Sequence, residues 1–458
     1  MNLDVYNAYN REPIASLGMH SWTQVEGWLQ EAYVAHQNNQ QLPPHHRRKI
    51  LQRCAMLMQK EAEDLARLIA TEGGKPLVDA RIEVSRAIAG VESCAALIDD
   101  LRGEQVPMDI AADSAGRMAF SIVEPIGVVV SVSAFNHPLN LIVHQIAPAI
   151  AAGCPVLIKP ANDTPLCAQR MVEIVAQAGL PSEYCRLVLC DNLVAEQLVT
   201  DWRVGFFSFI GSASVGWYLK SKLAPGTRCA LEHGGAAPVL VHKSADLGSM
   251  IGELTRGGFY HAGQVCVSVQ RVYVPNCNLE AFTEAYAQQV EQLQVGDPLR
   301  ENTQVGPLIR PAEVARVADW VSQARVGGAR LVCGGQAVGE TCYQPTILVN
   351  PPADAIVSQK EIFGPVVCVY GYDQWDHAIA LANSLPFAFQ AAVYSQQLEP
   401  ALDAFRRLNA SAVMVNDHTA FRVDHMPFAG RKQSGYGVGG MGYSLQDLCH
   451  HKMAVLRY

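Results

Sequence analysis

Hydrophobic and polar positions first follow a helical pattern along the chain. Residues 47–76, RRKILQRCAMLMQKEAEDLARLIATEGGKP, repeat apolar side chains at intervals of three and four. This spacing is typical of a helix that buries one face. The pattern ends at Gly73 and Gly74, with Pro76 just beyond, and such residues commonly stop a helix. We therefore expect the first hundred residues to form an outer helical layer.

From about Glu124 the pattern changes to short apolar runs that alternate with helical stretches. The predicted strands are IGVVVSVSAF (126–135), CPVLIK (154–159), CRLVLC (185–190), VGFFSFI (204–210) and RCALE (228–232). An apolar helix is expected at 139–152. Another should begin at Thr164 and Pro165, with Thr164 as its cap, and end at Gly179. This βαβαβ order predicts an α/β fold with a mostly parallel sheet wrapped by helices.

Composition and charge narrow the class of partner. The 458 residues are 49% hydrophobic and carry a formal net charge of −8, which argues against nucleic acid or an anionic membrane as partner. No apolar run reaches the roughly 18 residues of a membrane helix, and the start MNLDVYNAYNREP does not read as a signal peptide. The 13 cysteines show no spacing of a metal site, so we expect free thiols, no metal and a cytoplasmic protein with a small partner.

One strand-to-helix turn is a candidate phosphate site. Parallel sheets bind ligands where strand ends meet helix starts. In FSFIGSASVG, Gly211 and Ser212 follow a strand and open a helix, so free N–H groups and a hydroxyl can face a pyrophosphate. The alternative is an ordinary turn. A Gly-x-Gly-x-x-Gly pattern at Gly437, Gly439 and Gly442 is rejected, because no strand precedes it and too few residues follow.

Several short stretches carry side chains suited to acyl chemistry. Cys266 lies in GQVC, Glu232 ends a strand in LEHGGAAP, and Asn136 follows a strand in SAFNHPLN. Alone, each has a structural explanation, as a core thiol, a surface charge or a turn residue. With TEGGKP, IKPANDTP, FIGSASVG, EIFGP and MPFAGRKQSG, they form an ordered set that resembles the aldehyde dehydrogenase superfamily from about Tyr9 to the C-terminus.

The resemblance implies a mechanism with NAD or NADP and without a metal. Cys266 would attack the aldehyde, Asn136 and the Cys266 N–H would stabilise the oxyanion, and Glu232 would activate the water that hydrolyses the thioester. For the cofactor it implies Lys159 at the adenosine ribose, Ser212 at a phosphate, and Glu361 with Phe363 around the nicotinamide ribose. Other positions expected to contact the cofactor are Val132, Asn162, Gly211, Val215 and His233.

Three positions depart from the family pattern. Asn162 stands where NAD-preferring members often carry a glutamate, so we expect NADP to be accepted, although neighbouring Asp163 restores an acidic group. Gln145 and Gly439 occupy the places of a lysine and a glutamate that relay protons in many members. We expect Glu232 to exchange protons directly with water at the mouth of the site, and deacylation to be slow.

The substrate is indicated only by short stretches. FNHPLNL and FRVDHMPF resemble the branch with lactaldehyde and phosphonoacetaldehyde dehydrogenases, in which an arginine can precede the cysteine. Here that residue is Val265, which cannot pair with a dianion. We expect Arg422 to lie at the surface, His137 to be structural, and the substrate to be a small, hydroxylated aldehyde rather than a strongly anionic one. The residues considered for substrate contact are His137, Val265, Arg422 and Phe428.

Two other functions stay open, and the architecture follows from the resemblance. A coenzyme A-acylating dehydrogenase would resolve the thioester with a thiol, and a non-catalytic member would only bind or support a structure.

The expected division is a Rossmann-like cofactor domain (1–103 and 125–231), an α/β catalytic domain (232–420) and a small β oligomerisation arm (104–124 and 421–458). The alternating end LCHHKMAVLRY would be a hazardous free edge in a monomer, so we expect a homodimer or homotetramer.

Overall fold

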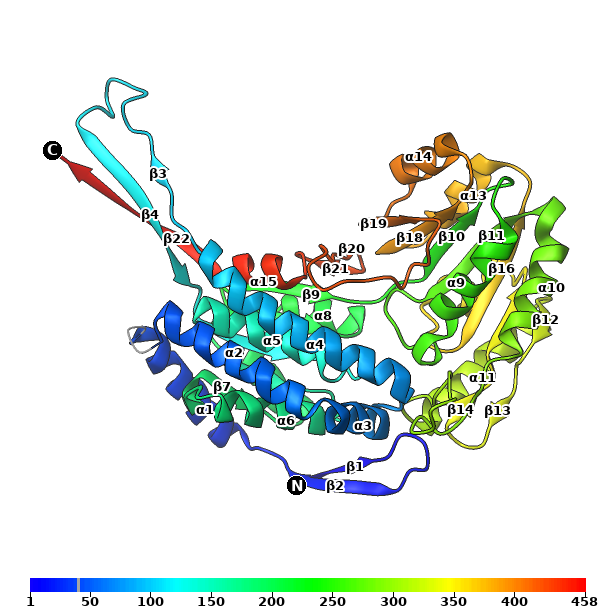
Figure 1. Ribbon diagram of the computed structural model, residues 1–458, viewed down its shortest axis with the longest axis horizontal. Helices are drawn as coiled ribbons and strands as arrows, with labels where there is room; N and C mark the ends of the chain where they lie inside the picture. Colours follow the sequence, from blue (N-terminus) through cyan, green and yellow to red (C-terminus); the bar gives the residue numbers. More distant parts are fainter. Residues whose placement is uncertain (39–41) are drawn as a thin grey trace.

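The computed structural model describes residues 1–38 and 42–458 and contains two mostly parallel sheets side by side (Figure 1). The first sheet has the order β21-β9-β8-β5-β6-β7. Its parallel strands are β5 (Val128–Val132), β6 (Val156–Lys159), β7 (Cys185–Leu187), β8 (Val204–Ile210) and β9 (Arg228–Glu232). The short antiparallel strand β21 (Gly435–Tyr436) closes the β9 edge. The predicted α/β fold with a parallel sheet is confirmed.

Helices cover both faces of this sheet. Every residue of α5 is buried, which explains its nearly unbroken apolar sequence. The helices are α1 (Trp22–Gln37), α2 (Pro44–Lys60), α3 (Ala62–Gly73), α4 (Leu77–Leu97), α5 (Asn140–Ala152), α6 (Pro165–Gln177), α7 (Asn192–Val199) and α8 (Ala213–Lys220). The prediction of a wholly helical beginning is wrong for the first 18 residues, which form the hairpin of β1 (Asn2–Tyr6) and β2 (Pro13–Gly18). The Asn7 side chain accepts from the Tyr9 N–H and begins the connecting turn.

Helix α6 begins where the sequence predicts, but its cap is different. The side chain of Thr164 makes no capping hydrogen bond. Instead the buried carboxylate of Glu72 accepts hydrogen bonds of 2.8 Å from the N–H groups of Leu166 and Cys167. An acidic group is favourable at a helix N-terminus, and here it comes from a distant helix. The face predicted for α6 is buried: Cys167, Met171, Ile174, Val175 and Ala178.

The second sheet has the order β12-β15-β16-β11-β10-β18-β19, with β12 antiparallel to β15. Its strands are β10 (Ala237–Val241), β11 (Val269–Pro275), β12 (Arg330–Cys333), β15 (Thr346–Val349), β16 (Val366–Tyr372), β18 (Gln390–Tyr394) and β19 (Ala412–Val415). Its helices are α9 (Leu247–Phe259), α10 (Leu279–Val290), α11 (Pro311–Val326), α12 (Ile356–Gln359), α13 (Trp375–Ala382) and α14 (Leu398–Arg407). Two small antiparallel pairs complete this part: β13 (Ala337–Val338) with β14 (Cys342–Tyr343), and β17 (Phe387–Ala388) with β20 (Arg431–Lys432).

A three-stranded antiparallel arm extends away from both sheets (Figure 1). It consists of β3 (Gln105–Val106), β4 (Arg117–Pro125) and the C-terminal β22 (Cys449–Arg457), with β4 in the middle. Between the sheets and β22, α15 (Met441–Asp447) packs against α4 and α5. The division into three domains stays a prediction. Among residues 1–38 and 42–458, no helix is both long and apolar enough to cross a membrane.

Candidate active site

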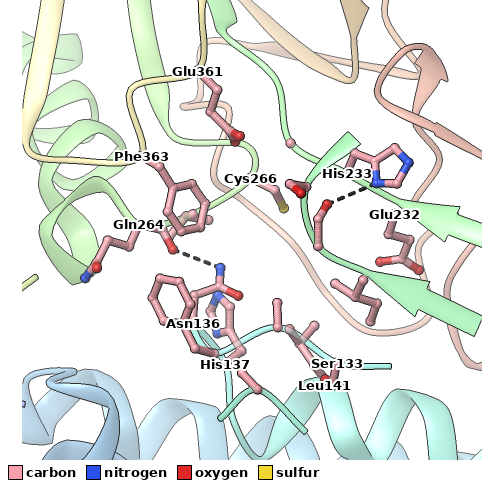
Figure 2. A pocket seen from close by; sticks show the side chains of 18 of the residues that line it. Ser133, Asn136, His137, Leu141, Glu232, His233, Gln264, Cys266, Glu361 and Phe363 are labelled. Atoms are coloured by element: carbon pink, nitrogen blue, oxygen red, sulfur yellow. Dashed lines mark hydrogen bonds between the residues drawn. The ribbon is translucent and has the colours of Figure 1, made fainter. Parts of the chain in front are cut away.

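A cavity of about 560 Å³ lies at the carboxyl ends of β5, β8 and β9, facing loops of the second sheet. Cys266, Glu232 and Asn136 all line it, although they are far apart in the sequence (Figure 2). Parallel strands place their carboxyl ends at one edge, which brings the Asn136 and Glu232 segments together. Cys266 reaches the same place from the loop between α9 and β11.

The loop that carries Cys266 has an unusual backbone. His261, Ala262 and Gly263 all have positive φ, at 48°, 54° and 70°. Residues with a Cβ rarely adopt this region, and a Cβ at Gly263 would stand only 2.2 Å from the Gly364 carbonyl oxygen. The tight turn therefore requires glycine at 263, just before the cysteine loop.

Gln264 fixes this loop in place. Its side-chain NH₂ donates to the His261 and Pro307 carbonyls at 3.3 and 3.2 Å, and its Oε1 accepts from the Ile309 N–H at 3.0 Å. The residue is 1% exposed. A fully bonded buried amide rigidifies its surroundings, so Gln264 holds the Cys266 loop against the segment that begins α11.

The Cys266 thiol is protonated in this environment. Burial raises its pKa to about 12, with Glu361 and Glu232 acting in the same direction and the cationic Arg422 acting against them. A thiolate is the nucleophilic form of cysteine. Deprotonation of Cys266 therefore needs help from a base or from positive charge that enters the cavity.

Asn136 links the two halves of the site. Its Nδ2 donates a hydrogen bond of 2.8 Å to the main-chain oxygen of Gln264, two residues before Cys266 (Figure 2). The side chain is buried, and a carboxamide nitrogen carries a second N–H. Asn136 can therefore keep the Gln264 bond and still donate into the cavity.

Glu232 is the last residue of β9 and is half-buried. Burial raises its pKa above the usual value, while Arg422 acts in the opposite direction. A Cβ at Gly439 would lie 2.1 Å from its Oε1, so the carboxylate rests directly against that glycine. A carboxyl group with a raised pKa is suited to accept and release a proton near neutral pH.

Most of the residues considered for the cofactor line the same cavity. They are Val132, Gly211, Ser212, Val215, His233, Glu361 and Phe363. Burial raises the pKa of Glu361 to about 8, while the Gly235 N–H, 3.2 Å from its Oε1, and Arg316 lower it. The His233 ring is held by Gly211, whose carbonyl lies 3.0 Å from its Nδ1 (Figure 2).

Lys159 and Asn162 lie just outside the cavity lining. Their side chains are joined by a hydrogen bond of 3.2 Å from Lys159 Nζ to Asn162 Oδ1. The adjacent Ala161 and Asp163 do line the cavity, and Asp163 faces Arg310 at 3.7 Å. Arg310 thus partly offsets the charge of Asp163.

His137 belongs to a buried charged network that the sequence did not indicate. Lys75 forms an ion pair with Glu83, and Lys75 Nζ lies 2.8 Å from His137 Nδ1. The other Glu83 oxygen accepts 3.0 Å bonds from the Leu139 and Asn140 N–H groups at the start of α5. Burial alone would raise the pKa of Glu83, but Lys75 and His137 hold it well below its usual range. The network fixes the segment that follows Asn136.

Arg422 lines the cavity, so the prediction of a surface position is wrong. Its guanidinium lies 3.6 Å from the ring centroid of Phe428, which also lines the cavity, as does Val265. Within residues 1–38 and 42–458, the Arg422 Nε is buried without a hydrogen-bond partner. No sequence pattern indicates this position, because residues 416–430 have little regular structure and no hydrophobic period.

Arg86 and Asp424 also belong to the site and were missed. Arg86 lines the cavity and forms two hydrogen bonds with the Asp424 carboxylate, at 3.1 and 2.8 Å. Asp424 also accepts from Asn140 and lies 2.8 Å from His144 Nε2. Arg86 is thus neutralised by Asp424, whereas Arg422 makes no such ion pair in the described chain.

Comparison with known proteins gives consistent matches over nearly the whole chain. The model of the Aldehyde dehydrogenase family matches residues 1–454. A 3-sulfolactaldehyde dehydrogenase from Priestia aryabhattai is 36% identical over 455 residues, which are 99% of this chain and 94% of the relative.

Two solved structures are similar in both fold and sequence. Aldehyde dehydrogenase 21 from Physcomitrella patens, in complex with the reaction product succinate, has a TM-score of 0.96 and 33% identity and is matched over 100% of this chain and 95% of its own. Glyceraldehyde-3-phosphate dehydrogenase from Methanocaldococcus jannaschii, complexed with NADP, has a TM-score of 0.95 and 32% identity, with 100% and 99% covered.

Proposed function

This chain belongs to the aldehyde dehydrogenase family and is an NAD(P)-dependent enzyme that oxidises an aldehyde to the carboxylic acid, and we propose that Cys266 is its nucleophile. The convergence of Cys266, Asn136 and Glu232 on one cavity carries this proposal. The Cys266 thiolate adds to the aldehyde carbon and forms a thiohemiacetal. After oxidation, the resulting thioester is hydrolysed by a water molecule that gives its proton to Glu232.

Asn136 supplies the oxyanion donor. One Nδ2 hydrogen is engaged by the Gln264 carbonyl, which orients the amide, and the second is available to the oxygen of the thiohemiacetal. The main-chain N–H of Cys266 is the second donor. Preorganised donors of this kind stabilise the charge that develops during addition without reorganising at that moment.

The residues around the cavity fit a nicotinamide dinucleotide. Ser212 precedes the first turn of α8, whose N–H groups have no partner within the helix and suit a phosphate. Gly234 leaves room for Glu361, because a Cβ at 234 would stand 1.7 Å from Glu361 Oε1. We assign Lys159 and Asn162 to the adenosine ribose, and Val132, Val215, His233 and Phe363 to the walls of the groove. When bound, the nicotinamide accepts a hydride from the substrate carbon.

NADP is accepted at the adenosine end. Asn162 is uncharged and is bonded to the cationic Lys159, while the carboxylate of the adjacent Asp163 faces Arg310 at 3.7 Å. A 2′-phosphate would therefore meet a lysine and an amide rather than an unopposed carboxylate. The NADP complex of the similar Methanocaldococcus jannaschii structure supports this assignment.

The substrate is a small aldehyde with an anionic group. Arg422 places a cation in the same cavity as Cys266, and it has no ion-pair partner among residues 1–38 and 42–458. An anion would complete the hydrogen bonding of its buried Nε. Phe428 lies against Arg422, and His137 and Val265 line the same cavity. The relative that acts on sulfolactaldehyde and the neighbour that holds succinate support an acidic substrate. We propose this class in place of the small, hydroxylated aldehyde that the sequence favoured.

Two structural proposals accompany the chemistry. The first sheet with its helices binds the cofactor, and the second sheet carries the nucleophile loop. The arm joins subunits into a dimer or tetramer, because β22 presents a free edge and exposes Met453, Val455 and Leu456.

Steady-state assays of reduced cofactor formation test the proposed function. The panel contains short aldehydes with a carboxylate or sulfonate and uncharged aldehydes of equal length, each with NAD and with NADP. We expect acid product without coenzyme A, preference for the anionic members, and no turnover by Cys266→Ser. Product formation only with coenzyme A would favour the acylating alternative. Turnover by Cys266→Ser at the wild-type rate would exclude Cys266 as the nucleophile.

A further inference from the structure

A second, smaller cavity of about 30 Å³ lies behind Glu232. Glu232 lines both this rear cavity and the large cavity that holds Cys266. The rear cavity is lined by residues of β5, α5, β8, β9 and α15, and its lining includes Gln145, Ser208, Gly439 and Asp447. The carboxyl group of Glu232 thus separates the reacting centre from a small polar chamber.

Gly439 lets the Glu232 carboxylate reach this rear chamber. Its missing side chain leaves the space that Glu232 Oε1 occupies, since a Cβ there would stand 2.1 Å from that oxygen. Any larger residue at 439 would push the carboxylate away from the chamber. Gly439, which stands where many family members carry a glutamate, therefore makes the rear chamber accessible to the carboxylate of Glu232.

Gln145 presents an unused acceptor to the same chamber. Its Nε2 donates to the Val132 carbonyl at 3.2 Å and to Ser208 Oγ at 3.1 Å. Among the described residues, its Oε1 is buried and has no hydrogen-bond partner. A cavity of this volume with several polar groups can hold a water molecule, which would donate to Gln145 Oε1.

Asp447 connects the chamber to solvent. It lines the rear cavity, yet its side chain is 34% exposed and lies 3.4 Å from Arg228 at the surface. The other titratable group on the chamber wall is His144, which is already bound to Asp424 at 2.8 Å. Asp447 is therefore the lining carboxylate that can exchange protons with bulk water.

We propose that Glu232 releases its proton through the rear cavity to Asp447, by way of a bound water, rather than through the mouth of the active site. This inference rests on the proposed role of Glu232 as the base for deacylation. Water attacks the thioester, its proton goes to Glu232, and the Cys266 sulfur leaves. Glu232 then passes that proton to the rear water, which passes one of its own to Asp447, and Asp447 releases it to solvent.

This route works while the front cavity is filled. During deacylation the acyl group is held on Cys266, which lines the same front cavity as Glu232. A rear exit returns Glu232 to its deprotonated form while the front cavity is still occupied. We propose this rear route in place of the direct proton exchange between Glu232 and water at the mouth of the site, which the sequence favoured. Asp447 is a positioning and relay residue in this scheme, because it touches neither substrate nor cofactor.

Para-nitrophenyl acetate tests this route without knowledge of the natural substrate. The ester acetylates Cys266 and releases para-nitrophenolate in a burst, and the later steady rate reports hydrolysis of the acetyl-enzyme. We expect Asp447→Asn to keep the burst but slow hydrolysis roughly tenfold at neutral pH, less than the 10²–10⁴-fold effect of a direct base. Asp447→Glu should restore the rate, and the loss in Asp447→Asn should shrink as pH rises, because hydroxide can then deprotonate Glu232 directly.

Three variants separate the alternatives. Arg228→Met breaks the same surface ion pair but keeps the carboxylate, so it should hydrolyse the acetyl-enzyme at the wild-type rate. Ala230→Val fills the rear cavity and should slow hydrolysis as Asp447→Asn does. An unchanged rate in Asp447→Asn, or equal losses in Asp447→Asn and Arg228→Met, would overturn the relay. If Glu232→Gln still hydrolysed the acetyl-enzyme normally, the proposed role of Glu232 itself would fail.

Discussion

The side-chain amide of Asn136 is tied to the main-chain oxygen of Gln264 by a hydrogen bond of 2.8 Å. This bond joins the segment after β5 to the loop that carries Cys266, so the oxyanion donor and the nucleophile are held by one contact. Gln264 is itself fixed by three further side-chain bonds. The relative position of amide and sulfur is therefore set before substrate enters.

Replacement of Asn136 by alanine should remove one oxyanion donor and leave the fold intact. Loss of a single such donor typically lowers turnover about 10²–10³-fold. Stopped-flow and steady-state assays with the best aldehyde of the panel measure this effect. Asn302→Ala is a suitable control, because Asn302 is exposed and does not line the cavity. Turnover of Asn136→Ala within threefold of wild type would mean that the amide does not contact the oxyanion.

Replacement of Arg422 by glutamine should alter the choice of substrate. A hydrogen bond to a charged group is worth about 1.5–3 kcal/mol, so kcat/KM for an anionic aldehyde should fall roughly 10- to 150-fold more than for an uncharged aldehyde of equal length. The ratio is the readout, because Arg422 also influences the Cys266 pKa. Arg316→Gln, which alters another arginine of the same cavity, should leave that ratio unchanged. Equal losses for both aldehydes would remove Arg422 from substrate recognition.

Alkylation of the free enzyme should follow the raised pKa of Cys266. Burial raises this pKa to about 12, so the thiolate fraction should increase about tenfold with each pH unit between neutrality and pH 10. Peptide mass spectrometry after brief iodoacetamide treatment measures this dependence. The exposed Cys277 serves as the accessible reference thiol on the same chain. A plateau in Cys266 labelling below pH 8 would contradict a neutral resting thiol.

Replacement of Glu83 by alanine should destabilise the protein strongly. The change leaves Lys75 buried without its partner and frees two N–H groups at the start of α5. Breaking a buried pair by removing one member costs about 3–5 kcal/mol in the free energy of unfolding. Urea denaturation measures the loss, with Glu280→Ala at an exposed ion pair as a control expected within about 0.5 kcal/mol of wild type. A similar small change for Glu83→Ala would show that the pair does not support α5.

The sequence predicted those parts of the molecule that depend on local order. The alternation of apolar runs and helical stretches indicates the parallel sheet, and strand ends in such a sheet collect at one edge. The sequence predicted that Asn136 follows one strand and that Glu232 ends another, while their place in one site was implied by the resemblance to the aldehyde dehydrogenase superfamily. The face of α6 was likewise predictable, because helical spacing alone determines which of its side chains are buried.

Other features depend on contacts between distant segments and have no local signal. Glu72 caps α6 from a separate helix, so the capping role assigned to Thr164 was wrong. Arg422 enters the cavity from an irregular segment in which no periodicity indicates burial. The role of Gly439 becomes visible only once Glu232 Oε1 is found against it, since a missing side chain leaves no pattern in a sequence.

The acyl-enzyme of the Glu232→Gln variant tests the central claim most directly. The variant is mixed with excess aldehyde and NADP, quenched, and examined by intact and peptide mass spectrometry together with the absorbance of reduced cofactor. We predict one equivalent of reduced cofactor per active site and an acyl group on the Cys266 peptide that persists instead of turning over. Multiple turnovers without a trapped acyl group, or an acyl group on any other residue, would contradict the mechanism.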